Sequence, residues 1–221
     1  MKKVLALVAA AMLTTAAFAE KVVEVGLKGG VLLNAGTKSY YDDESQDEGR
    51  KMSVGGDIGI FGHFGLVEIG SGALSLQPEL FFSIANGLKY EVDMFGYSYK
   101  DTCKFNTLDI AVLLGYDIPL GKARLTPFLG PKLGFAIGKI KEVVDNDGDK
   151  ETYTDTKAKG VGFGLDFGVG FAVPLGHFVL GADVRYGIDF TKFKETYDGE
   201  DTGSKMRRGA LGINLTAGYR F

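Results

Sequence analysis

Two histidines are the side chains in this sequence that could act as general bases near neutral pH, His63 and His177. A histidine paired with a serine could support acyl transfer. Nothing in the sequence, however, brings a nucleophile, a base and an orienting group together. The sequence therefore predicts that the protein is not an enzyme and needs no cofactor, with His63 hydrogen-bonded inside the fold and His177 in solvent.

One acidic run could bind a metal ion. In VVDNDGDKETYTDT, Asp145, Asp147 and Asp149 occupy the first, third and fifth positions of a calcium loop of the EF-hand type. Lys150 stands where that loop needs glycine, and Thr156 where it needs a bidentate glutamate. The run predicts a solvated acidic loop. Weak divalent-ion binding by the three aspartates, bridging lipid phosphates, stays open as the alternative.

Charge and cysteine content exclude other classes of partner. The formal net charge is −3, which argues against nucleic acid. With Cys103 as the single cysteine there is no internal disulfide, and no C-x-x-C motif occurs. Cys103 either stays free or pairs with another chain, and the sequence does not decide between these.

The first 19 residues have the pattern of a cleaved secretory signal. Lys2 and Lys3 precede an apolar run, and residues 17–19 form an A-x-A cleavage site. We expect a signal peptide at 1–19 and one domain at 20–221. No later apolar run reaches 18 residues, so no transmembrane helix is predicted.

Alternation with a period of two runs through the rest of the chain. Residues 160–173 read GVGFGLDFGVGFAV, with large hydrophobic residues on one face of a strand and glycine, alanine and a carboxylate on the other. Eight segments share this pattern: 22–33, 53–64, 74–84, 106–116, 124–137, 160–173, 178–190 and 208–221. Short turns follow the second, fourth and sixth segments. Long polar loops are expected at 34–52, 85–105, 138–159 and 191–207. This arrangement predicts an all-β fold, an eight-stranded antiparallel up-and-down barrel.

The less hydrophobic face of these strands carries charges of both signs. A soluble barrel would need an apolar interior, so the pattern predicts a transmembrane β-barrel with its apolar face in lipid. Enclosed charges must be paired, which predicts a network of ion pairs inside. Asp109 and Arg208 are among the other charged residues on this face. The network is expected to include Glu24, Lys28, Glu79, Lys132, Asp166, Asp183 and Arg185. Aromatic residues near strand ends, Phe105 among them, are expected at the membrane interfaces. Bulges are expected at Pro78, Pro127 and Pro131, because proline cannot donate to a strand ladder.

Several stretches resemble the small outer-membrane β-barrel proteins of diderm bacteria, the porin-like family with the outer-membrane β-barrel domain. They are LSLQPELFFS (74–83), TLDIAVLLGYDIPLG (107–121), TPFLGPKLGF (126–135), GFGLDFGVGFAVPLG (162–176), DVRYGIDF (183–190) and LTAGYRF (215–221). The resemblance implies the cell outer membrane as location, with membrane lipid and lipopolysaccharide as surroundings. It also implies that Tyr219 and Phe221 form the signal read by the barrel-assembly machinery.

Two functions remain open from the sequence. The long loops hold seven of the ten tyrosines, mixed with charged residues, which suits recognition of an extracellular partner. We therefore expect a monomeric barrel with a structural or adhesion-like surface role. The alternative is a narrow porin or a barrel that transports a small molecule or lipid.

Overall fold

The computed structural model describes residues 23–40, 50–94 and 97–221. The predicted signal peptide at 1–19 lies outside this part of the chain. Within it, no helix has the length and hydrophobicity needed to cross a membrane.

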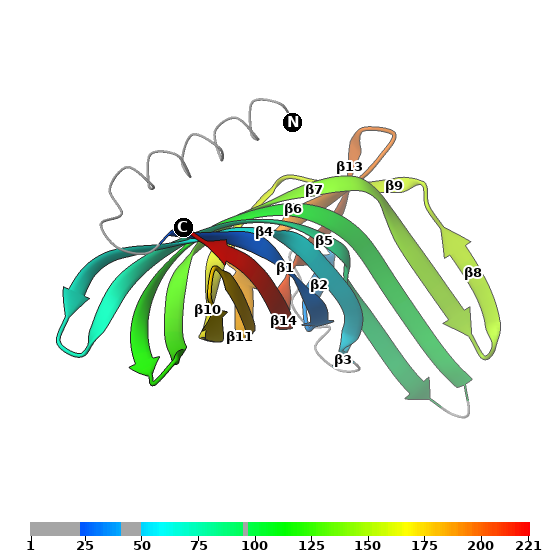
Figure 1. Ribbon diagram of the computed structural model, residues 1–221. Coiled ribbons are helices and arrows are strands. Elements are labelled where there is room, and N and C mark those ends of the chain that lie inside the picture. Colours follow the sequence, from blue (N-terminus) through cyan, green and yellow to red (C-terminus); the bar gives the residue numbers. More distant parts are fainter. Residues whose placement is uncertain (1–22, 41–49, 95–96) are drawn as a thin grey trace.

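Eight strands form a closed antiparallel ring, so the predicted fold is confirmed (Figure 1). The ring consists of β1 (Val23–Asn34), β4 (Ser53–Ile69), β5 (Gly72–Met94), β6 (Tyr97–Leu120), β7 (Ala123–Asn146), β10 (Val161–Leu175), β11 (Phe178–Asp189) and β14 (Gly209–Arg220). Each strand pairs with the next in this order, and β14 pairs with β1 to close the ring. Closure gives every strand two neighbours, which a strand in lipid requires because unpaired backbone groups are costly there.

Tight turns join the strands at one end of the barrel. Gly70, Gly121 and Gly176 each begin a two-residue turn with φ between 64° and 68°. Positive φ at the first turn position alone is the type II′ geometry, which matches the twist of paired strands and favours glycine. With an even number of strands, β1 begins and β14 ends at this end of the barrel. We call it the periplasmic end and the opposite one the extracellular end, because short turns are typical of the periplasmic side of such barrels.

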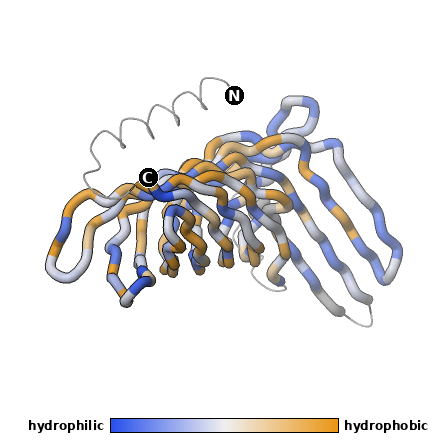
Figure 2. Tube along the Cα trace, viewed as in Figure 1, coloured by the Kyte–Doolittle hydropathy of each residue, from blue (hydrophilic) through white to orange (hydrophobic). Residues whose placement is uncertain are grey.

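The two faces of the ring have opposite chemistry. Hydrophobic side chains point outward and charged side chains point inward, which is the reverse of a soluble protein. Outward hydrophobic side chains are exposed: Leu27 by 63% and Phe167 by 46%. Inward charged side chains are buried: Lys28 is 5% exposed and Asp166 7%. Figure 2 shows the resulting alternation of hydrophobic and hydrophilic residues along the barrel strands. The apolar face is the one in contact with lipid.

At the other end the structure corrects the predicted loops. Long parts of 85–105, 138–159 and 191–207 are strands, because β5, β6 and β7 continue far past the barrel (Figure 1). Additional strands pair there: β2 (Thr37–Tyr40), β3 (Arg50–Lys51), β8 (Asp149–Tyr153), β9 (Thr156–Lys159), β12 (Phe193–Tyr197) and β13 (Glu200–Arg207). Asp147–Gly148 and Asp198–Gly199, all at positive φ, form the tips of two hairpins. Asp-Gly is a preferred type I′ pair, so these segments close as hairpins.

A small apolar core lies at the extracellular end, under this second group of strands. Its buried members are Cys103, Phe105, Ile140, Ala158, Phe193 and Met206. The rings of Phe105 and Phe193 meet edge to face with centroids 5.4 Å apart. Predicting Phe105 at the membrane interface is therefore wrong. Its place in β6 turns it inward, on the same face as Cys103.

The predicted bulges at the three prolines are also wrong. The register of the strand pairs is unbroken across Pro78, Pro127 and Pro131. At these positions the strand lacks one hydrogen bond but contains no extra residue. Register shifts occur elsewhere, at Gly65–Val67, Ser83–Asn86 and Lys104–Asn106.

Candidate functional site

Charged side chains from the inner faces of the ring strands fill the barrel in three groups along its axis. Glycines on the same faces make room for them. A Cβ at Gly187 would collide with Asp166 and Lys132, and one at Gly134 would collide with Arg208. The glycines of the alternating pattern are therefore part of the site.

The group at the periplasmic end is built around two carboxylates. Glu24, fully buried, accepts hydrogen bonds from both terminal nitrogens of Arg124, at 3.0 and 2.8 Å. Arg220 donates to the same carboxylate at 2.9 and 2.6 Å. Asp117 accepts from the Thr126 hydroxyl at 2.7 Å and lies 2.8 Å from His63 Nε2. The Arg220–Glu24 pair ties the last strand of the ring to the first, and the other contacts join β4, β6 and β7.

The central group is centred on Arg185. Its guanidinium donates to Glu79 through both terminal nitrogens, at 2.7 and 3.1 Å, and to Asp183 through Nε at 3.1 Å. Lys28 Nζ lies 2.5 Å from Glu79 and 2.7 Å from Asp183. The network is therefore a closed loop of two cations and two anions, which is the arrangement that makes buried charge tolerable.

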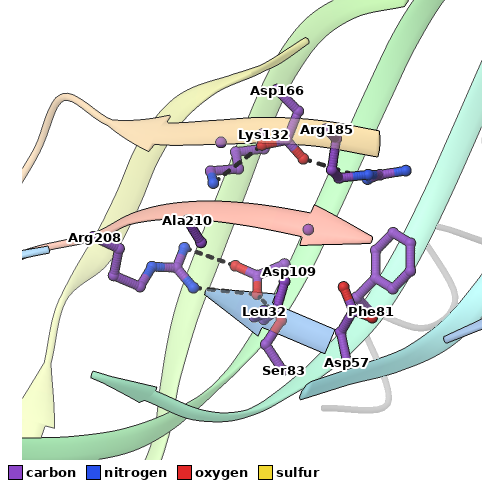
Figure 3. Close-up of a pocket in the computed structure, with 12 residues that line it drawn as sticks. Leu32, Asp57, Phe81, Ser83, Asp109, Lys132, Asp166, Arg185, Arg208 and Ala210 are labelled. Atoms are coloured by element: carbon purple, nitrogen blue, oxygen red, sulfur yellow. Dashed lines mark hydrogen bonds and ion pairs between the residues drawn. The ribbon is translucent and has the colours of Figure 1, made fainter. Parts of the chain in front are cut away.

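The third group lies below the apolar core. Arg208 donates to Asp109 at 2.7 Å and to Asp189 at 2.6 Å. Lys132 Nζ lies 3.1 Å from Asp166, and Arg185 reaches the same carboxylate at 3.5 Å. Figure 3 shows Lys132 and Arg185 both directed at Asp166, and Arg208 directed at Asp109. Asp166 thus joins the second and third groups.

Aromatic rings and small cavities complete the interior. Arg185 lies over the rings of Phe81 and Phe128, at 5.1 and 5.4 Å from their centroids. Such cation–π contacts stabilise a desolvated cation. Two cavities among these side chains measure about 50 and 40 Å³, room for a few water molecules. Asp57 lines the first of them, and among the residues that the structure describes its buried Oδ1 has no hydrogen-bond partner.

Six of the seven expected network residues form one connected set: Lys28, Glu79, Lys132, Asp166, Asp183 and Arg185. Glu24 lies apart, in the periplasmic group. Arg208 and Asp109 were expected on the inner face without being named among the network members, and Asp117 was not singled out. Asp117 could have been found from the sequence, because it continues the alternation of Thr107 and Asp109 along β6.

The other residues considered for chemistry lie far from one another. His177 is exposed in a periplasmic turn, where its Nδ1 lies 3.1 Å from the Arg220 carbonyl oxygen and its ring stacks on Tyr219. Tyr219 and Phe221, the expected assembly signal, are exposed on the lipid side of the chain end. Their rings contact each other with centroids 5.0 Å apart.

The three aspartates of the acidic run lie at the tip of the β7–β8 hairpin. Asp145 accepts a hydrogen bond from the Gly148 backbone at 3.0 Å and lies 3.7 Å from Lys150. Across the described ranges, no group of three or more metal-binding side chains is arranged to hold an ion. The contacts of Asp145 are therefore those of a residue that stabilises the turn of a hairpin.

Cys103 is buried in the apolar core, 1% exposed, and is not in a disulfide. Its Sγ lies 3.5 Å from Met206 Sδ. Residues 97–105 of β6 lie beyond the lipid-facing band, and burial there raises the pKa of the thiol to about 12. Pairing with another chain would require the core to open.

The closed ring, the exposed apolar band and the buried charges define a transmembrane β-barrel. The family model "Outer membrane protein beta-barrel domain" matches residues 4–221, and the chain belongs to this family. It is therefore a protein of the outer membrane.

One solved structure supports the fold with a TM-score above 0.5, and others are similar at lower scores. The chain is similar to the outer membrane protein OprG from Pseudomonas aeruginosa, with a TM-score of 0.54, 16% identity, and coverage of 92% of this chain and 98% of that one. A major outer membrane protein from Thermus thermophilus has a TM-score of 0.49 and 14% identity, over 91% and 100% of the two chains. Ail, the attachment invasion locus protein of Yersinia pestis, has 0.36 and 16%, over 90% and 98%. No curated protein sequence matches the chain.

Proposed function

We propose that this protein is a closed, monomeric barrel whose extracellular strands and hairpins bind a partner at the cell surface. The observation that carries the proposal is that the interior of the barrel is filled by ion pairs, while the extracellular segments form an ordered, exposed surface. Ion pairs occupy the inside, and an apolar core lies at its extracellular end. The extracellular segments are paired strands, a rigid platform for side chains that recognise another molecule.

Exposed tyrosines support a role in recognition. Tyr99, Tyr153 and Tyr197 lie on the extracellular strands and are between 40% and 53% exposed. Tyrosine offers a large contact area with little loss of conformational entropy, which is why it is enriched in binding surfaces. The proposal assigns no catalytic step to the protein and no cofactor.

The experiment trims the β7–β8 hairpin and leaves the barrel intact. Val143 and Thr152 are directly paired, so Asn-Gly in place of residues 144–151 closes the hairpin at that pair. A second variant changes Tyr99, Tyr153 and Tyr197 to alanine. The matched control changes the same three tyrosines to phenylalanine. Adherence of bacteria to a panel of immobilised proteins and glycans is measured.

We expect the trimmed and alanine variants to assemble and to lose adherence, while the phenylalanine control keeps most of it. Unchanged adherence in both variants would contradict the proposal. Assembly is checked by the shift in gel mobility between unheated and boiled samples.

A second candidate function is narrow transport of a small molecule or lipid. It is favoured by a cavity of about 490 Å³ at the periplasmic mouth, lined by Asp117, Arg124 and Arg220 among others. Uptake of small labelled solutes by proteoliposomes separates the two candidates. The surface role predicts no uptake above that of empty liposomes.

A further inference from the structure

Lysines lie directly opposite one another across strand pairs at the extracellular end. Lys139 pairs with Lys157, Lys159 with Lys194, and Lys104 with Lys141. The same holds for Lys194 with Lys205 and Lys51 with Lys89. Residues opposite each other in antiparallel strands have Cβ atoms about 4.5–5.5 Å apart, and like charges at these positions are destabilising. Some of these pairs have a carboxylate of the protein close by, since Glu91 lies 3.3 Å from Lys89 and Asp201 2.9 Å from Lys194. A facing pair without such a neighbour needs an anion from outside.

These lysines point outward. Ile140 and Ala158 are buried in the apolar core, so their neighbours Lys139, Lys157 and Lys159 project from the opposite face and are exposed. We call Lys104, Lys139, Lys141, Lys157, Lys159 and Lys194 the lysine belt.

The lysine belt begins where the lipid-facing band ends. On β7, the outward position before Lys139 is Ile137. At the junction of β9 and β10, Lys159 ends β9 and Val161, which is 46% exposed, begins β10. Basic side chains that directly follow an apolar band lie at the level of the lipid headgroups. The periplasmic end differs: in its three tight turns, described in full, Lys122 is the one lysine.

Part of the lysine belt forms a groove. Lys139, Lys157 and Lys159 line a depression of about 670 Å³ together with Tyr197. Asp155 and Asp198 also line it, but within the described residues none of the three lysines has an ion pair at 4 Å or less. Lys194, by contrast, is paired with Asp201 at 2.9 Å. The groove therefore presents three ammonium groups to an outside anion.

We propose that the lysine belt binds the phosphate groups of phosphorylated lipid headgroups in the outer leaflet, with Lys139 and Lys157 as the principal pair. A phosphate between two facing ammonium groups neutralises the repulsion, and the apolar band holds the lipid chains below. The site depends on the placement of the barrel in the membrane, and it does not depend on the proposed surface role.

The test compares the double variant K139Q/K157Q with a matched double, K122Q/K150Q, which removes the same charge at the periplasmic turn and at the hairpin tip. The folded barrels in neutral detergent are titrated with bisphosphorylated lipid A, and bound lipid is counted by native mass spectrometry. Each lysine at an anionic surface contributes about fivefold in affinity, so K139Q/K157Q is expected to bind about 30-fold more weakly. K122Q/K150Q is expected to bind like the wild type.

A thermal measurement separates binding from a structural role. Without lipid, K139Q/K157Q should unfold at the same temperature as the wild type or higher, because a repulsion has been removed. Lipid A should then raise the unfolding temperature of the wild type but not that of the double variant. Equal lipid binding by the two doubles would overturn the proposal. So would full displacement of lipid A by inorganic phosphate at tens of millimolar, since that would identify a site for free anions.

Discussion

Replacing Arg185 with methionine tests whether the interior network stabilises the barrel as a unit. The side chain is 5% exposed and joins Glu79, Asp183 and Asp166. Lys132 also lies 3.5 Å from Asp189, which Arg208 joins to Asp109. The connected network therefore holds four cations and five carboxylates, and R185M leaves three cations for five carboxylates. Removing one partner from a buried pair costs about 3–5 kcal/mol, mainly because the remaining charge stays buried. We expect a loss of that size in the free energy of unfolding.

The double variant R185M/E79M restores the wild-type excess of one carboxylate, at three cations and four carboxylates. Replacing both partners of a buried pair with apolar groups is often close to neutral. The double variant should therefore recover most of the stability lost in R185M. K122M, on the exposed periplasmic turn, is the control for a lost positive charge.

The assay is urea unfolding of the barrel in short-chain phosphatidylcholine vesicles, followed by far-UV circular dichroism because the sequence has no tryptophan. A loss below about 1 kcal/mol for R185M would refute the reasoning, since a buried charge left unpaired should cost several times that. A double variant that loses as much as the two single changes together would refute it as well.

Three further predictions concern the extracellular core and the chain end. Cys103 should resist thiol reagents in the folded barrel and react after unfolding, because burial raises its pKa to about 12; rapid labelling of the folded protein would contradict its placement. Burial, with Glu142 nearby, raises the pKa of Asp101 from 3.8 to about 6, beyond the lipid-facing band. The folded state therefore binds the Asp101 proton more tightly than the unfolded state does. The contribution of this proton to stability is lost as the pH rises through 6. D101N should slow amide hydrogen exchange of the extracellular strands at pH 7 and remove the dependence of their stability on pH near 6. Unchanged exchange in D101N would count against this role of Asp101. Deleting Phe221 should lower the amount of assembled barrel in cells but leave the stability of refolded protein unchanged; equal assembly would exclude an assembly signal there.

The barrel itself was predictable from the sequence because alternation reports directly which face a side chain occupies. Leu27 and Lys28 are neighbours in sequence and lie on opposite faces, 63% and 5% exposed. Charges on the less hydrophobic face then indicate lipid outside and a polar interior. The same rule places charged side chains inside the barrel, and the structure brings six of the expected residues into one connected set.

The extracellular strands were not predicted, because their segments are rich in charged and polar residues and contain few apolar ones. Cys103, Phe105 and Ile140 face a core formed by segments distant in sequence, and no local pattern shows that these segments meet. One local signal was available. Asp147–Gly148 and Asp198–Gly199 are Asp-Gly pairs, which favour tight hairpins within the segments expected to be loops.

The membership of the network was only partly predictable for a related reason. Arg208 directly precedes β14 and Asp109 lies on β6, on different sides of the ring, and their contact depends on how the strands are staggered around the barrel. The alternation places both side chains inside but does not give their relative height.

The most direct test of the central claim, that paired charges close the interior of this barrel, is its conductance in planar lipid bilayers. The wild-type protein, inserted in its heat-modifiable folded form, should give no steady channel current. R185M should remain non-conducting or show only brief openings, since Arg208 with Asp109 and the apolar core above them are unchanged. A steady, large conductance of the wild-type barrel would contradict the account.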